Sequence, residues 1–241
     1  MRLSLHLRNR SGWLRPWLTA LLCLPLLGKA GQLEPFVSTY EVSLRGVTVG
    51  QLTRELSYPA PGQYQFVSHL ESTGLASLLR KTWTEELSTG ALDAQGLSPS
   101  LYLETKASGR KRRESKVEFL SREGRIVQSH KGITHESPLE SGILDKLSYQ
   151  LALMRDLDQA TRSLSYRVAD DGKIKHYTLS VEGPESIRIT DGEISALRVA
   201  HAREGSGRRT TLWCAPSLGN LPVKIEYLEQ DGARIIAILR R

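Results

Sequence analysis

The chain has 241 residues and carries 33 basic and 26 acidic side chains, which gives a formal charge of +7. The first thirty residues hold five of the basic side chains and none of the acidic ones, so the remainder is close to neutral, at 28 against 26. This balance argues against a nucleic-acid partner, which a strongly basic chain would indicate. Residues 31–241 are long enough for one sizeable core, and we expect a single β-rich domain there.

The N-terminal segment has the layout of a secretory signal peptide. Four arginines precede an apolar run over residues 17–27, and small residues at Gly28 and Ala30 suit a leader peptidase. We expect cleavage near Ala30 and a periplasmic location. The run is short for a membrane span, which takes about 20 residues, and we expect no span in the mature chain. The alternatives are an uncleaved anchor and a lipid on Cys23, although the large Leu22 before this cysteine disfavours lipidation.

Alternation of apolar and polar residues dominates the next hundred residues and predicts antiparallel strands. Tyr40 and Val42 share the apolar face of a strand near residues 36–45. Arg54 falls on the same face of its strand as the neighbouring leucines, and Phe66 lies on the apolar face of the strand that follows. Residues 75–80 are predicted to form a helical turn or an apolar loop, and further strands are expected at 82–89, 100–106, 115–121 and 125–129.

One segment has helical rather than alternating periodicity. Its apolar residues recur every three or four positions, which predicts the main amphipathic helix over residues 142–158, starting at Ser141-Gly142. The apolar stripe of this helix either completes the core or closes a cavity as a lid or plug. The stripe consists of Ile143, Leu144, Leu147, Leu151, Met154 and Leu157.

After this helix, strands and turn dipeptides return. Asp-Gly pairs at 171–172, 191–192 and 231–232 lie between apolar alternations, which is a strong hairpin signal. Pro222 predicts an edge or a bulge in its strand. About thirteen strands in all predict a mainly β fold, either a curled antiparallel sheet or an open or closed barrel, since curling or closure removes exposed edges. The strands of this half are expected at 163–169, 173–182, 185–190, 193–203, 208–214, 221–229 and 233–240.

Sequence motifs of catalysis and metal binding are missing. Cys214 has no ionisable neighbour within three positions, so we expect a buried structural thiol. His130, His135 and Glu136 cluster, but their spacing matches no close-spaced metal motif, and we interpret them as solvated loop residues. We therefore predict no catalytic residue, no metal site, no cofactor and no enzymatic activity.

A curled sheet beside an amphipathic helix favours a binding function instead. Eight or more strands can enclose one small ligand, and we expect an apolar or lipid-like molecule carried in the cell envelope. The alternative is an assembly factor that binds other envelope proteins through exposed strand edges or a basic tip. The residues predicted to line the cavity are Tyr40, Val42, Phe66, Leu147, Leu151 and Met154.

The densest charge of the mature chain lies at a predicted hairpin tip. Arg110, Lys111, Arg112 and Arg113 are consecutive. Four cations at one tip are suited to the phosphates of lipid headgroups or lipopolysaccharide. The alternative is a solvated turn that keeps strand edges from pairing.

Several segments carry a family resemblance. They are Tyr40-Glu41-Val42-Ser43 with Gly46 and Gly50, Asp145-Lys146-Leu147-Ser148, Tyr177–Gly183, Leu212-Trp213-Cys214-Ala215-Pro216, Asn220–Glu226 and Asp231-Gly232. Together they resemble the exported bacterial family called domain of unknown function 3108, over about residues 36–240, most specifically between Trp213 and Ile225. The resemblance implies an exported, mostly β protein of a Gram-negative bacterium with no established activity. It also implies a fold similar to the open barrels of lipoprotein carriers of the LolA and LolB type.

Overall fold

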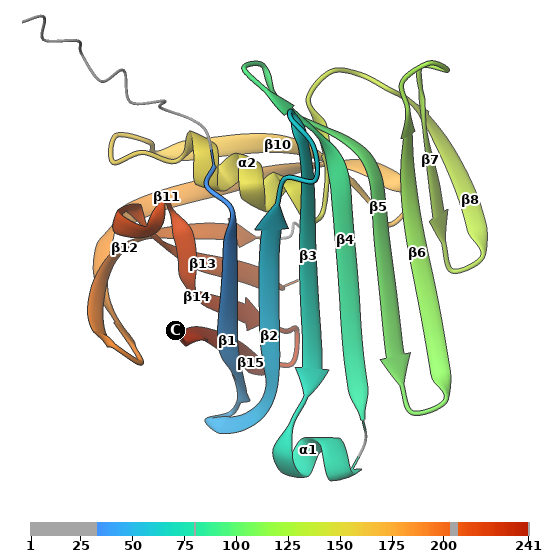
Figure 1. Ribbon diagram of the computed structural model, residues 1–241. Coiled ribbons are helices and arrows are strands. Elements are labelled where there is room, and N and C mark those ends of the chain that lie inside the picture. Colours follow the sequence, from blue (N-terminus) through green and yellow to red (C-terminus); the bar gives the residue numbers. More distant parts are fainter. Residues whose placement is uncertain (1–32, 80, 203–206, 241) are drawn as a thin grey trace, which may run out of the picture. The chain divides into compact units, whose positions relative to one another are not determined.

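The computed structural model describes residues 33–79, 81–202 and 207–240, and the predicted leader lies outside them. In this part of the chain, a single sheet of 15 strands accompanies two α-helices and one short 3-10 helix. The mainly β fold predicted from the alternation is confirmed, and the sheet is curled but not closed (Figure 1).

The strands of the N-terminal half are connected in sequence by short turns and one short helix. They are β1 (Phe36–Leu44), β2 (Val47–Ser57), β3 (Gln63–Ser72), β4 (Thr82–Asp93), β5 (Gly96–Ser108), β6 (Lys111–Leu120), β7 (Arg125–His130) and β8 (Ile133–Pro138), with helix α1 (Gly74–Leu79) between β3 and β4.

The second half starts with a three-residue strand and the longer helix. Its elements are β9 (Ile143–Asp145), α2 (Ser148–Asp156), β10 (Ser163–Asp170), β11 (Lys173–Ile189), β12 (Gly192–Ala202), β13 (Arg209–Ala215), the 3-10 helix η1 (Pro216–Leu218), β14 (Leu221–Leu228) and β15 (Arg234–Arg240).

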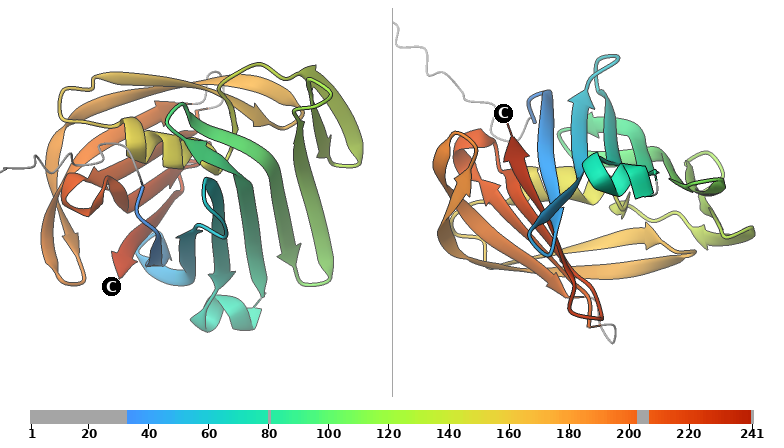
Figure 2. Two further views of the ribbon diagram at one scale, coloured as in Figure 1. Left: turned by 45° about the horizontal axis from the view of Figure 1, so that its top comes forward. Right: turned by 90° about the horizontal axis from the view of Figure 1, so that it is seen from below.

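The strand order joins the two halves of the chain through its first and last strands. It runs β8-β7-β6-β5-β4-β3-β2-β1-β15-β14-β13-β12-β11-β10-β9, and only the β9–β10 pair is parallel. The sheet bends so that its two halves face each other across α2 (Figure 2). Near its ends, His135 on β8 lies against Gly172 in the β10–β11 turn, although β8 has only β7 as a hydrogen-bonded neighbour. The bend therefore creates a concave face, which packs on α2.

The main helix is shorter than the periodicity predicts. Residues 143–145 form β9, and the helix begins only at Ser148. The cause is Asp145, whose buried carboxylate accepts hydrogen bonds from the backbone N–H groups of Leu147 and Ser148, each at 2.8 Å. A side chain that satisfies free N–H groups in this way fixes a helix start. The prediction of a helix over 142–158 is therefore wrong at its N-terminal end.

The strand predictions hold at most positions, and two features differ. The segments predicted at 173–182 and 185–190 form one strand, β11, whose pairing with β12 shifts at Glu182 and Pro184. The segment around His135, interpreted as a loop, is the edge strand β8. Pro222 lies in β14 next to a register shift at Trp213 and Cys214, so the predicted bulge is confirmed. The segment at 75–80 is the short helix α1.

Candidate functional site

The six predicted cavity residues all lie in one hydrophobic core cluster where α2 packs on the concave face. Each is buried, and the hydroxyl of Tyr40 donates a 2.8 Å hydrogen bond to the carbonyl of Pro222. Met154 also lines a surface cavity of about 350 Å³ beside Leu33 and Leu218. The structure thus brings together Tyr40, Val42, Phe66, Leu147, Leu151 and Met154 as neighbours in the core, while their role as a ligand lining stays a prediction.

A set of hydrogen-bonded polar side chains, which we call the polar anchor, connects the N-terminal end of α2 to the sheet. The carboxylate of Asp145, fully buried, also accepts a 2.7 Å hydrogen bond from the hydroxyl of Ser88 on β4. Ser88 is in turn 3.0 Å from the hydroxyl of Tyr64. Burial raises the pKa of Asp145 above its ordinary value, although the hydrogen bonds it accepts act in the opposite direction. This anchor links the helix to the sheet.

A row of polar side chains crosses the concave face between two rows that contain the apolar pairs Phe36–Leu56 and Tyr40–Leu52. Consecutive members are direct register partners on neighbouring strands, from β1 to β7. Several of them are buried. The members of this set, which we call the polar row, are Ser38, Arg54, Ser68, Glu86, Glu104, Ser115 and His130.

The two carboxylates in the middle of the polar row have partners. Glu104 accepts from Lys146 at 2.8 Å and from Lys106 at 2.9 Å. Burial alone would raise the pKa of Glu104, but the two lysines hold it below its ordinary value. Glu86 accepts a 2.7 Å hydrogen bond from the hydroxyl of Tyr102. These acids therefore have partners within the protein.

The end of the sheet opposite α2 carries a basic and apolar cleft. This end, which we call the rim, includes the β1–β2 turn, α1 and the β5–β6 turn (Figure 1). A cleft of about 350 Å³ opens there and is lined by nine residues, of which none is acidic. Leu70, Lys106, Lys111 and Arg113 are among them. Alternation in β3, β5 and β6 places all four on the concave face.

The predicted basic tip is divided by the structure. Lys111 and Arg113 line the rim cleft. Arg112 instead pairs with Glu114 at 2.9 Å and lies with its guanidinium carbon 5.9 Å from the ring centre of Trp83. Arg110 is exposed in the turn that precedes β6. Two of the four cations therefore face the concave side, and their contact with headgroups stays a prediction.

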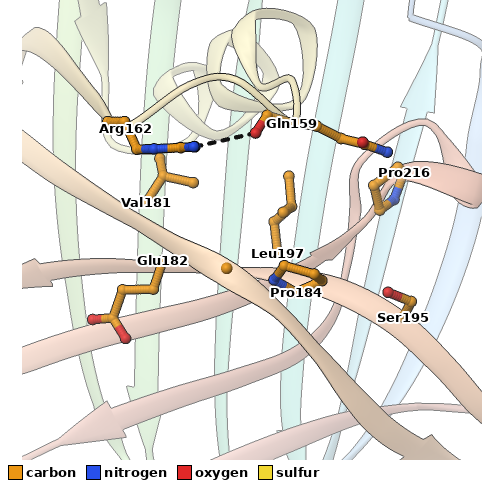
Figure 3. A pocket seen from close by; sticks show the side chains of 9 residues that line it. Gln159, Arg162, Val181, Glu182, Pro184, Ser195, Leu197 and Pro216 are labelled. Carbon is orange, nitrogen blue, oxygen red and sulfur yellow. Dashed lines mark hydrogen bonds between the residues drawn. The ribbon is translucent and has the colours of Figure 1, made fainter.

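A second cavity, of about 450 Å³, lies at the irregular point of β11. It is bounded by Val181, Pro184 and Leu197, and by Gln159 and Arg162 of the α2–β10 loop (Figure 3). The guanidinium of Arg162 donates to the carbonyl of Gln159 at 3.1 Å rather than to a group across the cavity. The site therefore combines apolar walls with polar groups from the loop and from β11 and β12, and none of the predicted lining residues contributes to it.

The groups capable of catalysis or metal binding are dispersed or deeply buried. Burial raises the pKa of the Cys214 thiol to about 12, which leaves it protonated at neutral pH. Nδ1 of His130 lies 3.1 Å from the hydroxyl of Ser115. In the described ranges, no group of three or more histidine, cysteine, aspartate or glutamate side chains is placed to hold a metal ion. Nor does any helix in those ranges have both the length and the hydropathy to cross a bilayer.

The polar row is the feature that sequence reasoning missed. Alternation already places Arg54 and Ser68 on the apolar faces of their strands, which is the local signal. Alternation alone does not give the register between strands, which aligns these residues into one continuous row. Register depends on turn lengths and bulges over several strands, so the row becomes visible only in the folded sheet.

Comparison with known proteins gives a family and a fold. Residues 39–238 match the family described as "Protein of unknown function (DUF3108)", and no curated protein matches the chain. The chain is similar in structure to a "Beta-barrel-like Protein of Domain of Unknown Function DUF1849 from Brucella abortus", with a TM-score of 0.58 and 10% identity, covering 86% of this chain and 96% of that one. This likeness shows the fold alone. The family match, by contrast, covers residues 39–238, which is most of the chain, so the chain belongs to the DUF3108 family.

Proposed function

We propose that this protein is an exported, periplasmic binding or carrier module for an apolar or lipid-like ligand of the cell envelope. The single observation that carries this proposal is the rim cleft, which joins an apolar wall at Leu70 to three cations without an acidic lining residue. A lipid has the complementary parts, an acyl chain and an anionic head. The leader-like N-terminal sequence supports export.

Exposed apolar side chains at the rim support loading from a membrane. Leu78 on α1 is 81% exposed and Val47 at the start of β2 is 64% exposed. Arg45 and Lys81, both exposed, lie next to these elements in the chain. Apolar residues that stay in water beside cations are suited to the interface of an anionic bilayer. A ligand could then pass from the membrane into the concave face without crossing bulk water.

Native mass spectrometry of the protein purified from its own cells tests the proposal. We expect a mass excess that organic solvent removes and that fragmentation identifies as a lipid or another amphiphile. The variant Leu70→Glu puts a carboxylate into the cleft and should lower the occupied fraction. Its matched control, Val37→Glu, changes an exposed residue on the opposite face of the sheet and should not. Protein recovered only without ligand, from every preparation, would contradict the proposal.

The edge strand β8 supports the second candidate, an assembly factor that binds envelope proteins. Five of its six residues are exposed, and β7 is its sole hydrogen-bonded neighbour within the described sheet. An exposed edge can accept a strand from a partner. Photo-crosslinking in cells from position Ile133 distinguishes the two: a discrete protein adduct favours this candidate, whereas co-purified lipid without an adduct favours the first.

A further inference from the structure

Arg54 is a buried cation that has no ion pair within the described ranges. It lies in the middle of β2 within the polar row, and 4% of its surface is exposed. Its Nε has no hydrogen-bond partner, and the hydroxyl of Ser38, its register partner on β1, has none either. Among the described residues, no carboxylate oxygen comes within 4 Å of the guanidinium. A buried charge is costly unless it is paired, so this arrangement calls for an explanation.

Phenol groups, rather than carboxylates, surround the guanidinium. Tyr149 on α2 and Tyr227 on β14 both lie close enough for Arg54 to lower their pKa values, although burial raises both more strongly. The ring centre of Tyr40 is 6.0 Å from the guanidinium carbon. Neither the hydroxyl of Tyr149 nor that of Tyr227 donates a hydrogen bond to another group in the described part of the chain. Two phenolic donors and one cationic donor therefore share a small buried region.

Glu86 is the acidic neighbour of this region, and it is engaged elsewhere. It raises the pKa values of Tyr149 and Tyr227 as a negative charge would, so it lies within reach of the same hydroxyls. Its carboxylate accepts the 2.7 Å hydrogen bond from Tyr102 instead of pairing with Arg54. On the sheet, Ser68 separates the two residues. The positive charge of Arg54 therefore lacks a direct counterion among the residues that the structure describes.

The rim cleft lies next to the region around Arg54, on the side toward the rim. Leu52 precedes Arg54 by two positions on the same face of β2, and its register partner is Leu70, which lines the cleft. The pair at the cleft wall and the Arg54–Ser68 pair of the polar row are thus direct neighbours on the concave face. An acyl chain lying along Leu52 and Leu70 would place its head group at the level of Arg54.

The geometry points to an anion-binding subsite at Arg54, in which the carboxylate or phosphate of an amphiphilic ligand accepts hydrogen bonds from the guanidinium and from the hydroxyls of Tyr149 and Tyr227. This inference rests on the proposed function and specifies its ligand class. A guanidinium is well matched to carboxylate and phosphate oxygens, and a charged acceptor strengthens each bond. The ligand would supply the counterion that the fold omits.

Calorimetric titration of the purified protein with three probes tests the subsite. Dodecanoate carries a chain and an anionic head, dodecanol carries the same chain with a neutral head, and inorganic phosphate carries only the anion. For the natural protein, we expect dodecanoate to bind at least about tenfold more tightly than dodecanol. If phosphate binds as tightly as dodecanoate, the inference of an amphiphilic ligand is overturned, and a free anion is identified as the ligand.

Variants at the subsite separate a binding role from a structural one. Arg54→Met keeps the volume but removes the charge, so the preference for dodecanoate should fall to about one while dodecanol binding is unchanged. Its thermal midpoint should equal or exceed that of the natural protein, because an unpaired buried charge is removed. Tyr227→Phe, which removes one hydroxyl, should lower the preference by several-fold and serves if the first variant does not fold. The matched control Arg198→Met alters an arginine that pairs with Glu182 and stacks near Trp213, and should leave the preference unchanged.

The outcomes distinguish this inference from the function on which it rests. Equal binding of dodecanoate and dodecanol by the natural protein would overturn the subsite but keep the lipid-like ligand. A natural protein that binds neither probe would overturn both. A large loss of stability in Arg54→Met, with parallel losses for both probes, would assign Arg54 a structural role and also overturn the subsite.

Discussion

The two ends of the concave face differ in how far their apolar side chains are exposed to solvent. At the end that packs on α2, the side chains of Leu147, Leu151 and Leu153, on the helix or directly before it, are fully buried. At the rim, Leu78 stays largely exposed and Leu70 is 36% exposed. The same curled sheet therefore hides apolar surface at one end and presents it at the other. The buried end provides the stability of the fold, and the rim has apolar surface available for a ligand or a membrane.

Charge follows the same division. Near α2, Lys146 pairs with Glu104 and Lys175 pairs with Asp170, and Arg54 is an exception because its Nε has no partner. At the rim cleft the cations outnumber the acids, since Lys106 reaches Glu104 while Lys111 and Arg113 line the cleft without an acidic neighbour among its lining residues. Satisfied charges favour a fixed structure, and an excess of one sign favours a partner of the other sign.

The largest expected effect comes from the buried end. Leu151→Ala removes a fully buried side chain from the contact between α2 and the sheet, and should lower the free energy of unfolding by about 2–5 kcal/mol. The control Leu78→Ala changes an exposed leucine and should stay within about 0.5 kcal/mol. Urea unfolding of both variants measures the difference. Equal losses would show that the two ends do not differ in their contribution to stability.

A pH-dependent effect should come from Asp145. Because its pKa is raised in the fold, the folded state binds a proton more readily than the unfolded chain just above the ordinary value of 3.8. As the pH rises through this interval, the natural protein should lose stability relative to Asp145→Asn, which does not titrate. The shift should be about 1.4 kcal/mol for each unit by which the pKa is raised. Unfolding measured between about pH 4 and pH 8 gives the relative change, and a difference that moves the other way would contradict the assignment.

Smaller effects are expected from charges at the rim. The double variant Lys111→Glu with Arg113→Glu should weaken binding to vesicles that contain anionic phospholipid by about tenfold or more, because each cation near such a surface contributes about 1 kcal/mol. Flotation of vesicles with and without anionic lipid measures this. Arg122→Glu, which reverses a single charge in the exposed β6–β7 turn, is the control away from the rim and should bind as the natural protein does. Retained binding by the double variant would show that the rim does not contact the membrane.

The smallest expected effect is that of a single apolar side chain. Leu78→Ser should weaken vesicle binding by several-fold, in line with about 1 kcal/mol for a leucine that is partly withdrawn from water. Val37→Ser alters an exposed apolar residue away from the rim and should have no effect. The same flotation assay ranks the two variants. A stronger effect at Val37 would place the membrane contact on the outer face of the sheet.

Local pattern was sufficient for most of the fold. The alternation around Tyr40 and Phe66 identified strands whose predicted apolar faces are buried, and the Asp171-Gly172 pair forms a hairpin turn with positive φ at both residues. It failed where tertiary contacts override local spacing. Ile143 and Leu144 fit a helical stripe, yet they form β9, because pairing with β10 and the carboxylate of Asp145 delay the helix.

The candidate site was predicted less completely. The cations at 110–113 were recognised from their density, but the side to which each points depends on the β5–β6 turn, which directs Lys111 and Arg113 to the cleft. The position of Arg54 on an apolar face could be read from alternation. The lack of a counterion for Arg54 could not be read from the sequence, because its neighbours Tyr149 and Tyr227 come from elements about one hundred residues or more away in the sequence.

Photo-crosslinking with a fatty acid that carries a diazirine in the part of its chain close to the carboxylate tests the central claim most directly, which is that the concave face holds an amphiphile. After irradiation, peptide mass spectrometry locates the modified side chains. The account predicts adducts on concave residues of β2 and β3, above all Leu52 and Leu70, and their loss when excess dodecanoate is present. Adducts confined to the outer face around Val37, or to the cavity at Pro184, would contradict it.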